Sequence, residues 1–259
     1  MKRVVAITGG SAGIGRATAL ALARSGASVA LCARRGELLE AVGEEIRRLG
    51  GQAFVLTADV TQEADMDRFV NHAVEHFGRL DAMICNAGFG IYGAIDQIAP
   101  ADMRRLIDVN YMGTYHAARA ALPIFRRQGT GHVVIISSIV GKRGVPYVGA
   151  YAATKFAQAG LAECLRAELV GTGIHVTVVY PISTETEFFQ VMTRESGHAT
   201  RAAGPRQSAE RVANAIAWAI ERPTPEVYPY GLAKWLAVIN AVAPGLTDIL
   251  VKRWGRKPI

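Results

Sequence analysis

Residues 151–155, Tyr-Ala-Ala-Thr-Lys, carry a phenol and an amine one helical turn apart. Tyr151 and Lys155 stand at positions i and i+4, so a helix would present both side chains on one face. A phenol titrates near pH 10, and an adjacent ammonium would lower that pKa toward neutrality. The pair is therefore a candidate proton donor to a carbonyl oxygen, or a proton acceptor from an alcohol.

Chance supplies such pairs only occasionally. With 8 Tyr and 6 Lys in 259 residues, about 0.2 pairs at this spacing are expected. A second pair, Tyr230 and Lys234, follows a proline and has no serine at the corresponding upstream spacing. We therefore interpret this second pair as a coincidence.

Polar residues that follow apolar runs give Tyr151 a chemical context. Ser138 ends the run His-Val-Val-Ile-Ile-Ser-Ser and could address the same substrate oxygen as Tyr151. Asn86 follows another apolar run, in Cys-Asn-Ala-Gly. Asn110 lies in an apolar helical stretch, where its amide must find partners. Taken alone, Asn110 is better explained by a structural hydrogen bond than by catalysis.

Short apolar runs alternate with helical patterns along most of the chain. Repeated alternation of this kind predicts right-handed βαβ units and a parallel sheet with buried strands. We expect an α/β fold: one doubly wound, Rossmann-type sheet of about seven strands, with helices on both faces, in a single domain over residues 1–259. The expected strands are 3–8, 28–33, 52–58, 80–88, 131–138 and 174–180, and the expected helices are 13–25, 35–49, 62–77, 101–128 and 150–170.

The segment Thr-Gly-Gly-Ser-Ala-Gly-Ile-Gly joins the first strand to the first helix. In a doubly wound sheet this junction binds phosphate, because the helix N-terminus offers free N–H groups and a positive dipole end. One glycine permits the turn, the next allows close approach to the ligand, and the third allows close packing. The predicted phosphate-binding residues are Gly9, Ser11, Ala12, Gly13, Ile14 and Gly15.

The end of the second strand predicts which nucleotide is bound. An acidic residue there would hold the ribose 2′-hydroxyl of NAD, but Ala33 stands at that position and Arg34 and Arg35 follow it. Two guanidinium groups match a 2′-phosphate, so we expect NADP(H) as the cofactor. The alternative is that both arginines are ordinary solvated residues at a helix start. Asp59 and Val60, after the third strand, are expected at the adenine edge.

Taken together, these motifs resemble the short-chain dehydrogenase/reductase family in order and spacing, from about residue 3 to residue 223. The resemblance implies that Tyr151 is the acid/base, Ser138 steadies the carbonyl oxygen, and Lys155 lowers the tyrosine pKa and binds the nicotinamide ribose. It implies that Asn110 holds a water in a proton relay that starts at Lys155. Further cofactor contacts implied by the resemblance are Asn86, Ala87, Gly88, Pro181, Thr184 and Thr186.

Two residues depart from the family pattern. Cys85 replaces the first asparagine of Asn-Asn-Ala-Gly, and Ile182 replaces the glycine of Pro-Gly. A branched residue at 182 would narrow the nicotinamide side of the pocket. The resemblance also implies a homodimer or homotetramer, formed through the helices that contain Asn110 and Tyr151.

The expected activity is hydride transfer between NADP(H) and a carbonyl or secondary alcohol. Apolar pocket segments favour a hydrophobic substrate, such as a ketone or a steroid-like, lipid-like or aromatic compound. An alternative function is a catalytically silent NADP(H)-binding interaction or sensor protein, but such a protein would not need the complete Asn, Ser, Tyr and Lys set. The segment following the sixth strand, about 183–204, is expected to form a substrate lid, with 197–205 as a mobile loop.

Composition and charge narrow the remaining classes. The net charge of +7 comes mainly from scattered arginines without a basic run, so no nucleic-acid partner is expected. Three cysteines in apolar surroundings predict buried free thiols in a reducing compartment, and no secretory signal or spanning helix is expected, so the predicted location is cytoplasmic. His72 and His76 lack a third ligand, so no metal site is expected.

The C-terminal stretch 231–259 combines apolar residues at helical spacing with a basic end. It could lie on a membrane surface as an amphipathic helix. It could equally cap the substrate pocket or form a subunit interface, and the sequence slightly favours these two alternatives.

Overall fold

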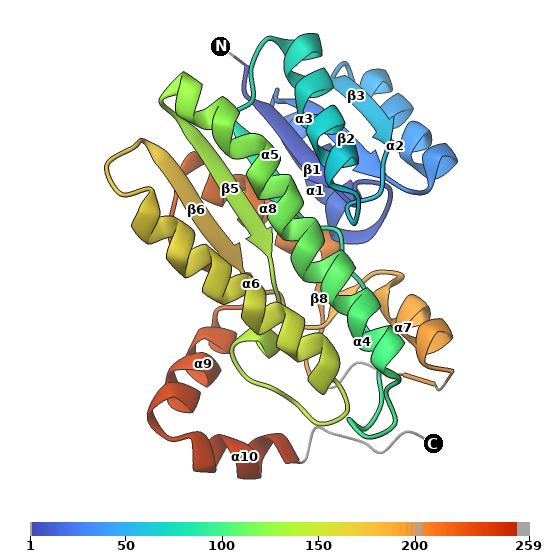
Figure 1. Cartoon of the computed structure of the whole chain (residues 1–259), viewed down its shortest axis with the longest axis vertical. Coiled ribbons are helices and arrows are strands. Elements are labelled where there is room, and N and C mark those ends of the chain that lie inside the picture. The colour runs from blue at the N-terminus through green and yellow to red at the C-terminus, as the bar shows by residue number, and fades with distance from the viewer. Residues whose placement is uncertain (1, 198, 201–203, 253–259) are drawn as a thin grey trace.

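Seven parallel strands form the central sheet of the computed structural model, which describes residues 2–197, 199–200 and 204–252 (Figure 1). Every neighbouring pair runs parallel, in the order β3-β2-β1-β4-β5-β6-β9. This arrangement confirms the expected doubly wound sheet. The strands are β1 (Val4–Thr8), β2 (Ser28–Ala33), β3 (Gln52–Thr57), β4 (Ala82–Cys85), β5 (Gly131–Ile136), β6 (Ile174–Val179) and β9 (Glu226–Val227).

Helices cover both faces of the sheet. The first group, α1, α2 and α8, packs on one face, and α3, α5 and α6 pack on the other. A second, two-stranded sheet of β7 (Thr184–Glu185) and β8 (Gln207–Ser208) lies outside the main one. The α-helices are α1 (Gly13–Arg24), α2 (Gly36–Arg48), α3 (Glu63–Phe77), α4 (Pro100–Leu106), α5 (Gly113–Gln128), α6 (Gly149–Glu168), α7 (Phe188–Ser196), α8 (Ala209–Glu221), α9 (Leu232–Val242) and α10 (Pro244–Lys252).

Alternate residues of each strand supply the two halves of the core. In β1, Val5 and Ile7 face the cluster under α1 and α8, whereas Val4 and Ala6 face the cluster under α3 and α5. All four are buried, which explains why the strands read as continuous apolar runs without alternation of polar residues.

Strand order reverses between β1 and β4, which are adjacent although two strands separate them in the sequence. Such a reversal leaves a crevice at the carboxyl edge of the sheet, because the following helices turn to opposite faces. The glycine loop after β1 and the Asn86 loop after β4 both open onto this crevice.

The predicted continuous helix over 101–128 is interrupted. A π-helical turn, η1 (Ile107–Met112), separates α4 from α5, and Asn110 lies within it. In a π turn the i→i+4 hydrogen-bond ladder is broken, which frees carbonyl oxygens for other donors. The hydrophobic period continues through the turn, so the sequence pattern could not reveal it.

Two further features of the fold were not anticipated. The seventh strand, β9, is not among the six strand ranges expected from the sequence, because a strand of two residues is too short to give an apolar run. The prediction that all three cysteines are buried is wrong for Cys164, which is exposed, whereas Cys32 and Cys85 are buried. Cys164 lies on the outer side of α6, between the buried Ala162 and Leu165.

The end of the chain forms two short helices, as expected from Pro244, which cannot continue a helix. Helices α9 and α10 meet at Pro244 and lie at the end of the molecule opposite the N-terminus (Figure 1). The part of the predicted tail beyond residue 252 falls outside the described residues, as do residues 198 and 201–203 of the predicted lid and loop. Within the described residues, no helix is both long and apolar enough to cross a membrane.

Candidate active site

A cavity of about 1120 Å³ opens at the carboxyl edge of the sheet. It is larger than the roughly 300–1,000 Å³ of an ordinary ligand pocket, which leaves room for two molecules. Every residue singled out in the sequence as catalytic or cofactor-binding lines it, except Gly15 and Asn110, which are buried behind its wall. Residues from seven different loops and helices are thus brought to one site.

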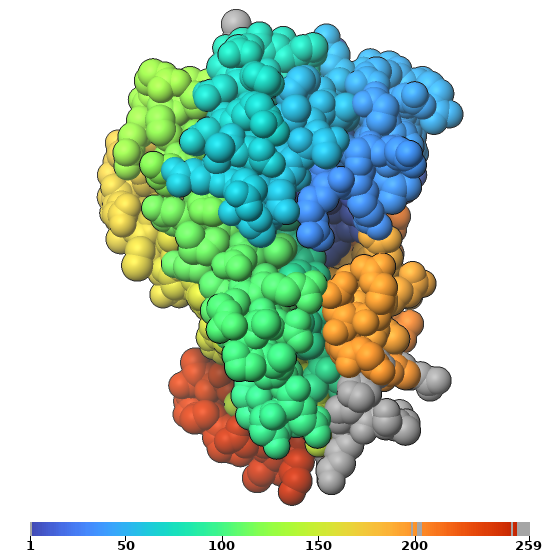
Figure 2. All heavy atoms as spheres, turned by 45° about the vertical axis from the view of Figure 1, so that its right-hand side comes forward, coloured from blue at the N-terminus to red at the C-terminus, as the bar shows by residue number. Residues whose placement is uncertain are grey.

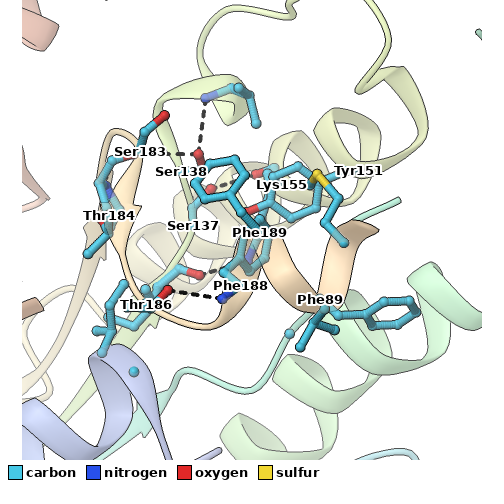
Figure 3. Close-up of a pocket in the computed structure, with 18 of the residues that line it drawn as sticks. Phe89, Ser137, Ser138, Tyr151, Lys155, Ser183, Thr184, Thr186, Phe188 and Phe189 are labelled. Atoms are coloured by element: carbon cyan, nitrogen blue, oxygen red, sulfur yellow. Dashed lines mark hydrogen bonds between the residues drawn. The ribbon is translucent and has the colours of Figure 1, made fainter. Parts of the chain in front are cut away.

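Tyr151 is the third residue of α6 and points into this cavity beside Ser138 (Figure 3). Burial raises the pKa of the phenol, and a hydrogen bond with Ser138 acts in the opposite direction. The Lys155 ammonium lies 5.6 Å from the centre of the tyrosine ring. The expected lowering of the tyrosine pKa by Lys155 therefore does not outweigh burial in this arrangement.

Lys155 is a buried amine held by neutral acceptors. Its Nζ donates to the carbonyl oxygen of Ile136 at 2.9 Å and to Oε1 of Gln158 at 3.1 Å. No carboxylate of the described chain pairs with it, and burial lowers its pKa to about 7. The lysine can therefore change protonation state close to neutral pH.

Gln158 connects Lys155 to the π turn. Its Nε2 donates to the carbonyl oxygen of Asn110 at 2.8 Å and to the hydroxyl of Thr114 at 2.7 Å. The carbonyl that η1 releases thus meets a donor from α6. Gln158 was not among the residues expected at the site, although, like Asn110, it is an amide in an apolar helical stretch and therefore needs buried partners.

The Asn110 side chain forms three hydrogen bonds within the protein. Its Nδ2 donates to the carbonyl of Phe89 at 2.9 Å and to Thr154 Oγ1 at 3.0 Å, and its Oδ1 accepts from the Phe89 N–H at 3.0 Å. These bonds hold the loop after β4 against α6. A Cβ on Gly88 would lie 3.0 Å from Asn110 Oδ1, so this close packing favours glycine.

The loop after β1 has the shape of a phosphate cradle. Gly9 adopts a left-handed φ of +67°, and a Cβ at Gly15 would lie 2.3 Å from the carbonyl oxygen of Gly9. Asn86 fastens the loop by donating from Nδ2 to the carbonyl oxygens of Thr8 at 2.9 Å and Gly9 at 3.2 Å. A side chain at Gly15 would thus displace the loop from the N-terminus of α1.

The far end of the cavity carries the paired arginines. Arg34 and Arg35 line it together with Ala33 and Asp59. Arg35 forms a two-bond ion pair with Glu187, which precedes α7. The Glu187 carboxylate therefore holds the guanidinium that the sequence analysis assigned to a phosphate.

Helix α7 covers the cavity, and polar contacts from three directions hold it there. Besides the Arg35–Glu187 pair, Arg105 binds Glu195 at 2.8 Å, and the Tyr92 N–H donates to the Ser196 hydroxyl at 2.7 Å. At its first residue, Phe188 packs on the ring of Tyr151 with 5.5 Å between ring centres (Figure 3).

Thr186 completes this cover from the segment that precedes α7. A Cβ on Gly13 would lie 3.3 Å from Thr186, so the segment after β6 closes directly over the glycine loop. Pro181, Ile182 and Thr184 line the same wall of the cavity.

Neither the second Tyr–Lys pair, Tyr230 and Lys234, nor the pair His72 and His76 lies together in the cavity as Tyr151 and Lys155 do. Tyr230 lines the cavity but precedes α9, whereas Lys234 is exposed and does not line the cavity. His72 and His76 are both exposed on α3, and the described residues contain no cluster of three or more potential metal-binding side chains.

Comparison with known proteins places this geometry in a family. Residues 3–197 match the family described as short chain dehydrogenase. An uncharacterized oxidoreductase of Listeria monocytogenes is 35% identical over 226 residues, covering 85% of this chain and 91% of the relative.

Solved structures agree with this relationship. An alcohol dehydrogenase from Thermococcus sibiricus in complex with 5-hydroxy-NADP is 27% identical, with a TM-score of 0.78, and the match covers 88% of this chain and 96% of that one. A short chain dehydrogenase/reductase from Burkholderia phymatum in complex with NAD has a TM-score of 0.86 at 23% identity, and the match covers 95% of each chain. This second likeness shows the fold alone.

The buried lysine predicts how stability depends on pH. Because its pKa falls from 10.5 to about 7 on folding, the unfolded chain binds more protons between these values. The free energy of unfolding should therefore rise with pH across this window, by up to about 1.4 kcal/mol per pH unit from this group. Urea unfolding of the ligand-free protein at about pH 7 and about pH 9 measures the rise.

Two variants test whether Lys155 causes this pH dependence. In Lys155→Met, the free energy of unfolding should rise less between about pH 7 and about pH 9. Gln158→Glu should reduce the rise as well, because a carboxylate 3.1 Å from Nζ would raise the lysine pKa toward its ordinary value. The same pH dependence in all three proteins would contradict the interpretation.

Proposed function

We propose that this chain, which belongs to the short-chain dehydrogenase family, is an NADP(H)-dependent enzyme that interconverts a hydrophobic carbonyl compound and its secondary alcohol. Members of the family are oxidoreductases that bind NAD(P). The observation that carries the proposal is the placement of Ser138 and Tyr151 side by side at the wall of a largely apolar cavity (Figure 3).

The residues at the carboxyl edge of the sheet fit a nicotinamide dinucleotide. The glycine loop and the N-terminus of α1 would hold the diphosphate, and Asp59 and Val60 would border the adenine. The wall formed by Pro181, Thr184 and Thr186 would border the nicotinamide end. When bound, the nicotinamide supplies or accepts the hydride, which is chemistry that no side chain of this protein can perform.

The side chains would supply the proton and the orientation. Tyr151 Oη gives a proton to the substrate oxygen in reduction and takes it back in oxidation, and Ser138 Oγ offers a second hydrogen bond to that oxygen. A cationic Lys155 favours the phenolate form of Tyr151, and its low pKa lets it release a proton near neutral pH. Phe188 covers the tyrosine ring and excludes water from the reacting atoms.

The cavity wall supports a hydrophobic substrate. Its apolar surface comes from three segments, after β4, before α6 and along α7, and the tail adds one more side. Such a wall favours burial of a ketone, aromatic or lipid-like skeleton and leaves few polar groups to orient it. Apolar side chains that line the cavity include Phe89, Tyr92, Val140, Val145, Pro146, Val148, Ile182, Phe188, Phe189, Val191, Met192, Leu232 and Leu236.

Exposed apolar side chains support pairing of two copies through α5 and α6. Tyr115 and Phe156 are exposed on these helices, and Ile107 is exposed on the adjoining π turn. A homodimer or homotetramer would cover them. We further propose that the chain works as one domain in the cytoplasm, with 183–204 as its lid.

Replacing Tyr151 by Phe tests the proposed acid/base. The variant keeps the ring and its contact with Phe188 but loses the proton donor, so kcat should fall by roughly 10²–10⁴-fold. NADP(H) binding should remain nearly unchanged in a fluorescence titration. The assay follows NADPH absorbance with a panel of ketones, aldehydes and alcohols.

Tyr230→Phe is the matched control, because it removes the same hydroxyl from another wall of the same cavity. Its kcat should stay within a few-fold of the parent. If Tyr151→Phe retains full activity on a true substrate, the reductase mechanism fails. If no substrate is turned over while NADP(H) binds tightly, the silent binding protein becomes the better description.

Substitutions that remove single charges near the expected 2′-phosphate test the preference for NADP(H) over NAD(H). Arg34→Ala and Arg35→Ala should each weaken NADP(H) binding by about tenfold or more, because a charge-assisted hydrogen bond contributes roughly 1.5–3 kcal/mol. NAD(H) binding should change little. Glu187→Gln should act in the opposite direction and tighten NADP(H), since it frees Arg35 and removes a negative charge. Equal affinities of the unmodified protein for NAD(H) and NADP(H) would refute the preference.

The lid is tested by amide hydrogen exchange. Binding of NADP(H) with a substrate should slow exchange in α7, because Phe188 at its start packs on Tyr151 and Thr186, just before it, packs on the glycine loop. Amides of α3, which does not line the cavity, serve as the internal control. Unchanged exchange in α7 under saturating ligands would count against a lid.

A further inference from the structure

Helices α9 and α10 expose an unusually apolar surface. Trp235 is 65% exposed and Val242 is 82% exposed, although residues of both kinds are normally buried. The two helices lie together at one end of the molecule (Figure 2). We call this surface the terminal apolar face; its members are Leu232, Trp235, Val238, Ile239, Val242, Leu246 and Ile249.

The outward side of α9 is apolar in addition to its packed side. Its inward residues are Ala233, Leu236, Ala237 and Asn240, at the spacing of one helical stripe. The opposite side presents apolar residues with Lys234 as its one charge. A helix that is apolar all round requires an apolar environment on every side, and the described protein supplies it on one.

Polar contacts hold the two helices against the site. Arg143 donates to Asn240 Oδ1 at 3.2 Å and to Asp248 Oδ1 at 2.5 Å. Asn240 in turn donates to the carbonyl oxygen of Lys142 at 3.1 Å and accepts from Thr247 at 2.7 Å. The terminal apolar face is therefore a fixed surface presented outward.

The charge of this region selects the partner. The described part of the tail, residues 231–252, carries two exposed lysines, Lys234 and Lys252, and its one acidic residue, Asp248, is already paired with Arg143. A second copy of the chain on this face would bring two more lysines against them. An anionic surface would instead gain attraction while covering the apolar side chains.

We propose that the terminal apolar face docks on an anionic lipid surface. Trp235 is suited to the boundary between headgroups and acyl chains, where an amphipathic indole is favoured. The neighbouring aliphatic side chains enter the acyl region, and Lys234 and Lys252 meet lipid phosphates. The docking does not depend on the reductase activity.

A consequence for substrate entry follows, and this point does rest on the proposed function. Leu232, Ala233 and Leu236 of α9 also line the cavity, so one helix borders both the apolar cavity and the lipid-facing surface. A lipid-like substrate could pass between the two along this helix without crossing water.

Vesicle flotation of the full chain tests the docking. We expect binding to phosphatidylcholine vesicles that contain phosphatidylglycerol, weakened by high salt, and much less binding to pure phosphatidylcholine. Trp235→Glu and Val242→Glu should each reduce binding by about tenfold or more, since a carboxylate must then enter the apolar layer. Neither residue lines the cavity, so turnover of a water-soluble substrate and the melting temperature should stay unchanged.

Val170→Glu is the matched control. Val170 is 81% exposed after the C-terminus of α6, at the opposite edge of the sheet, and its substitution should leave vesicle binding intact. Absence of binding by the unmodified protein overturns the proposal. The proposal is also overturned if light scattering shows that the unmodified protein is an oligomer and that Trp235→Glu and Val242→Glu are monomers. The terminal apolar face would then join two copies of the chain. Tyr151→Phe should lose turnover but still float with the vesicles. This result would separate the docking proposal from the proposed reductase activity.

Discussion

Lys155 is an amine buried without a carboxylate among the described residues, and much of the site is arranged around it. Burying a charge without a counter-ion is costly, so the group needs good acceptors and its pKa falls. The last carbonyl of β5 and the amide of Gln158 supply those acceptors. Ser137 accompanies them by donating to the Lys155 carbonyl at 2.9 Å, and Gly141 leaves the space for that contact. Strand β5, helix α6 and the π turn are thus coupled through one ammonium group.

This coupling explains why the π turn lies where it does. A regular helix would keep the Asn110 carbonyl within its own ladder, whereas the π turn offers it to Thr114 and Gln158 at 2.8 Å. Gln158 then has partners at both ends of its amide, which a fully buried amide requires. The Asn110 side chain, on the same turn, fastens the loop after β4. A single irregularity in one helix therefore orients a lysine and a loop that come from different parts of the chain.

Much of the fold and many site residues could be predicted because their causes are local. Six of the seven strands are continuous apolar runs, and the glycines of the first loop are required by a left-handed φ at Gly9 and a close approach at Gly15. The rest depends on contacts between distant segments. The Arg35–Glu187 pair joins residues 152 positions apart, and Gln158 gains its role only because α6 packs against η1. Exposure of Cys164 likewise depends on which side of α6 faces the sheet.

The three cysteines differ in burial, so their reactivity toward a thiol reagent reports local opening of the central sheet. Burial raises the pKa of Cys32 and of Cys85, so neither thiol is reactive while the sheet is closed, whereas Cys164 is accessible throughout. A thiol reagent should therefore modify one site at once and the other two only as β2 and β4 become exposed. Both strands end at the wall of the cavity. The rate of the slow modification therefore measures the free energy of local opening of β2 and β4, separately from global unfolding.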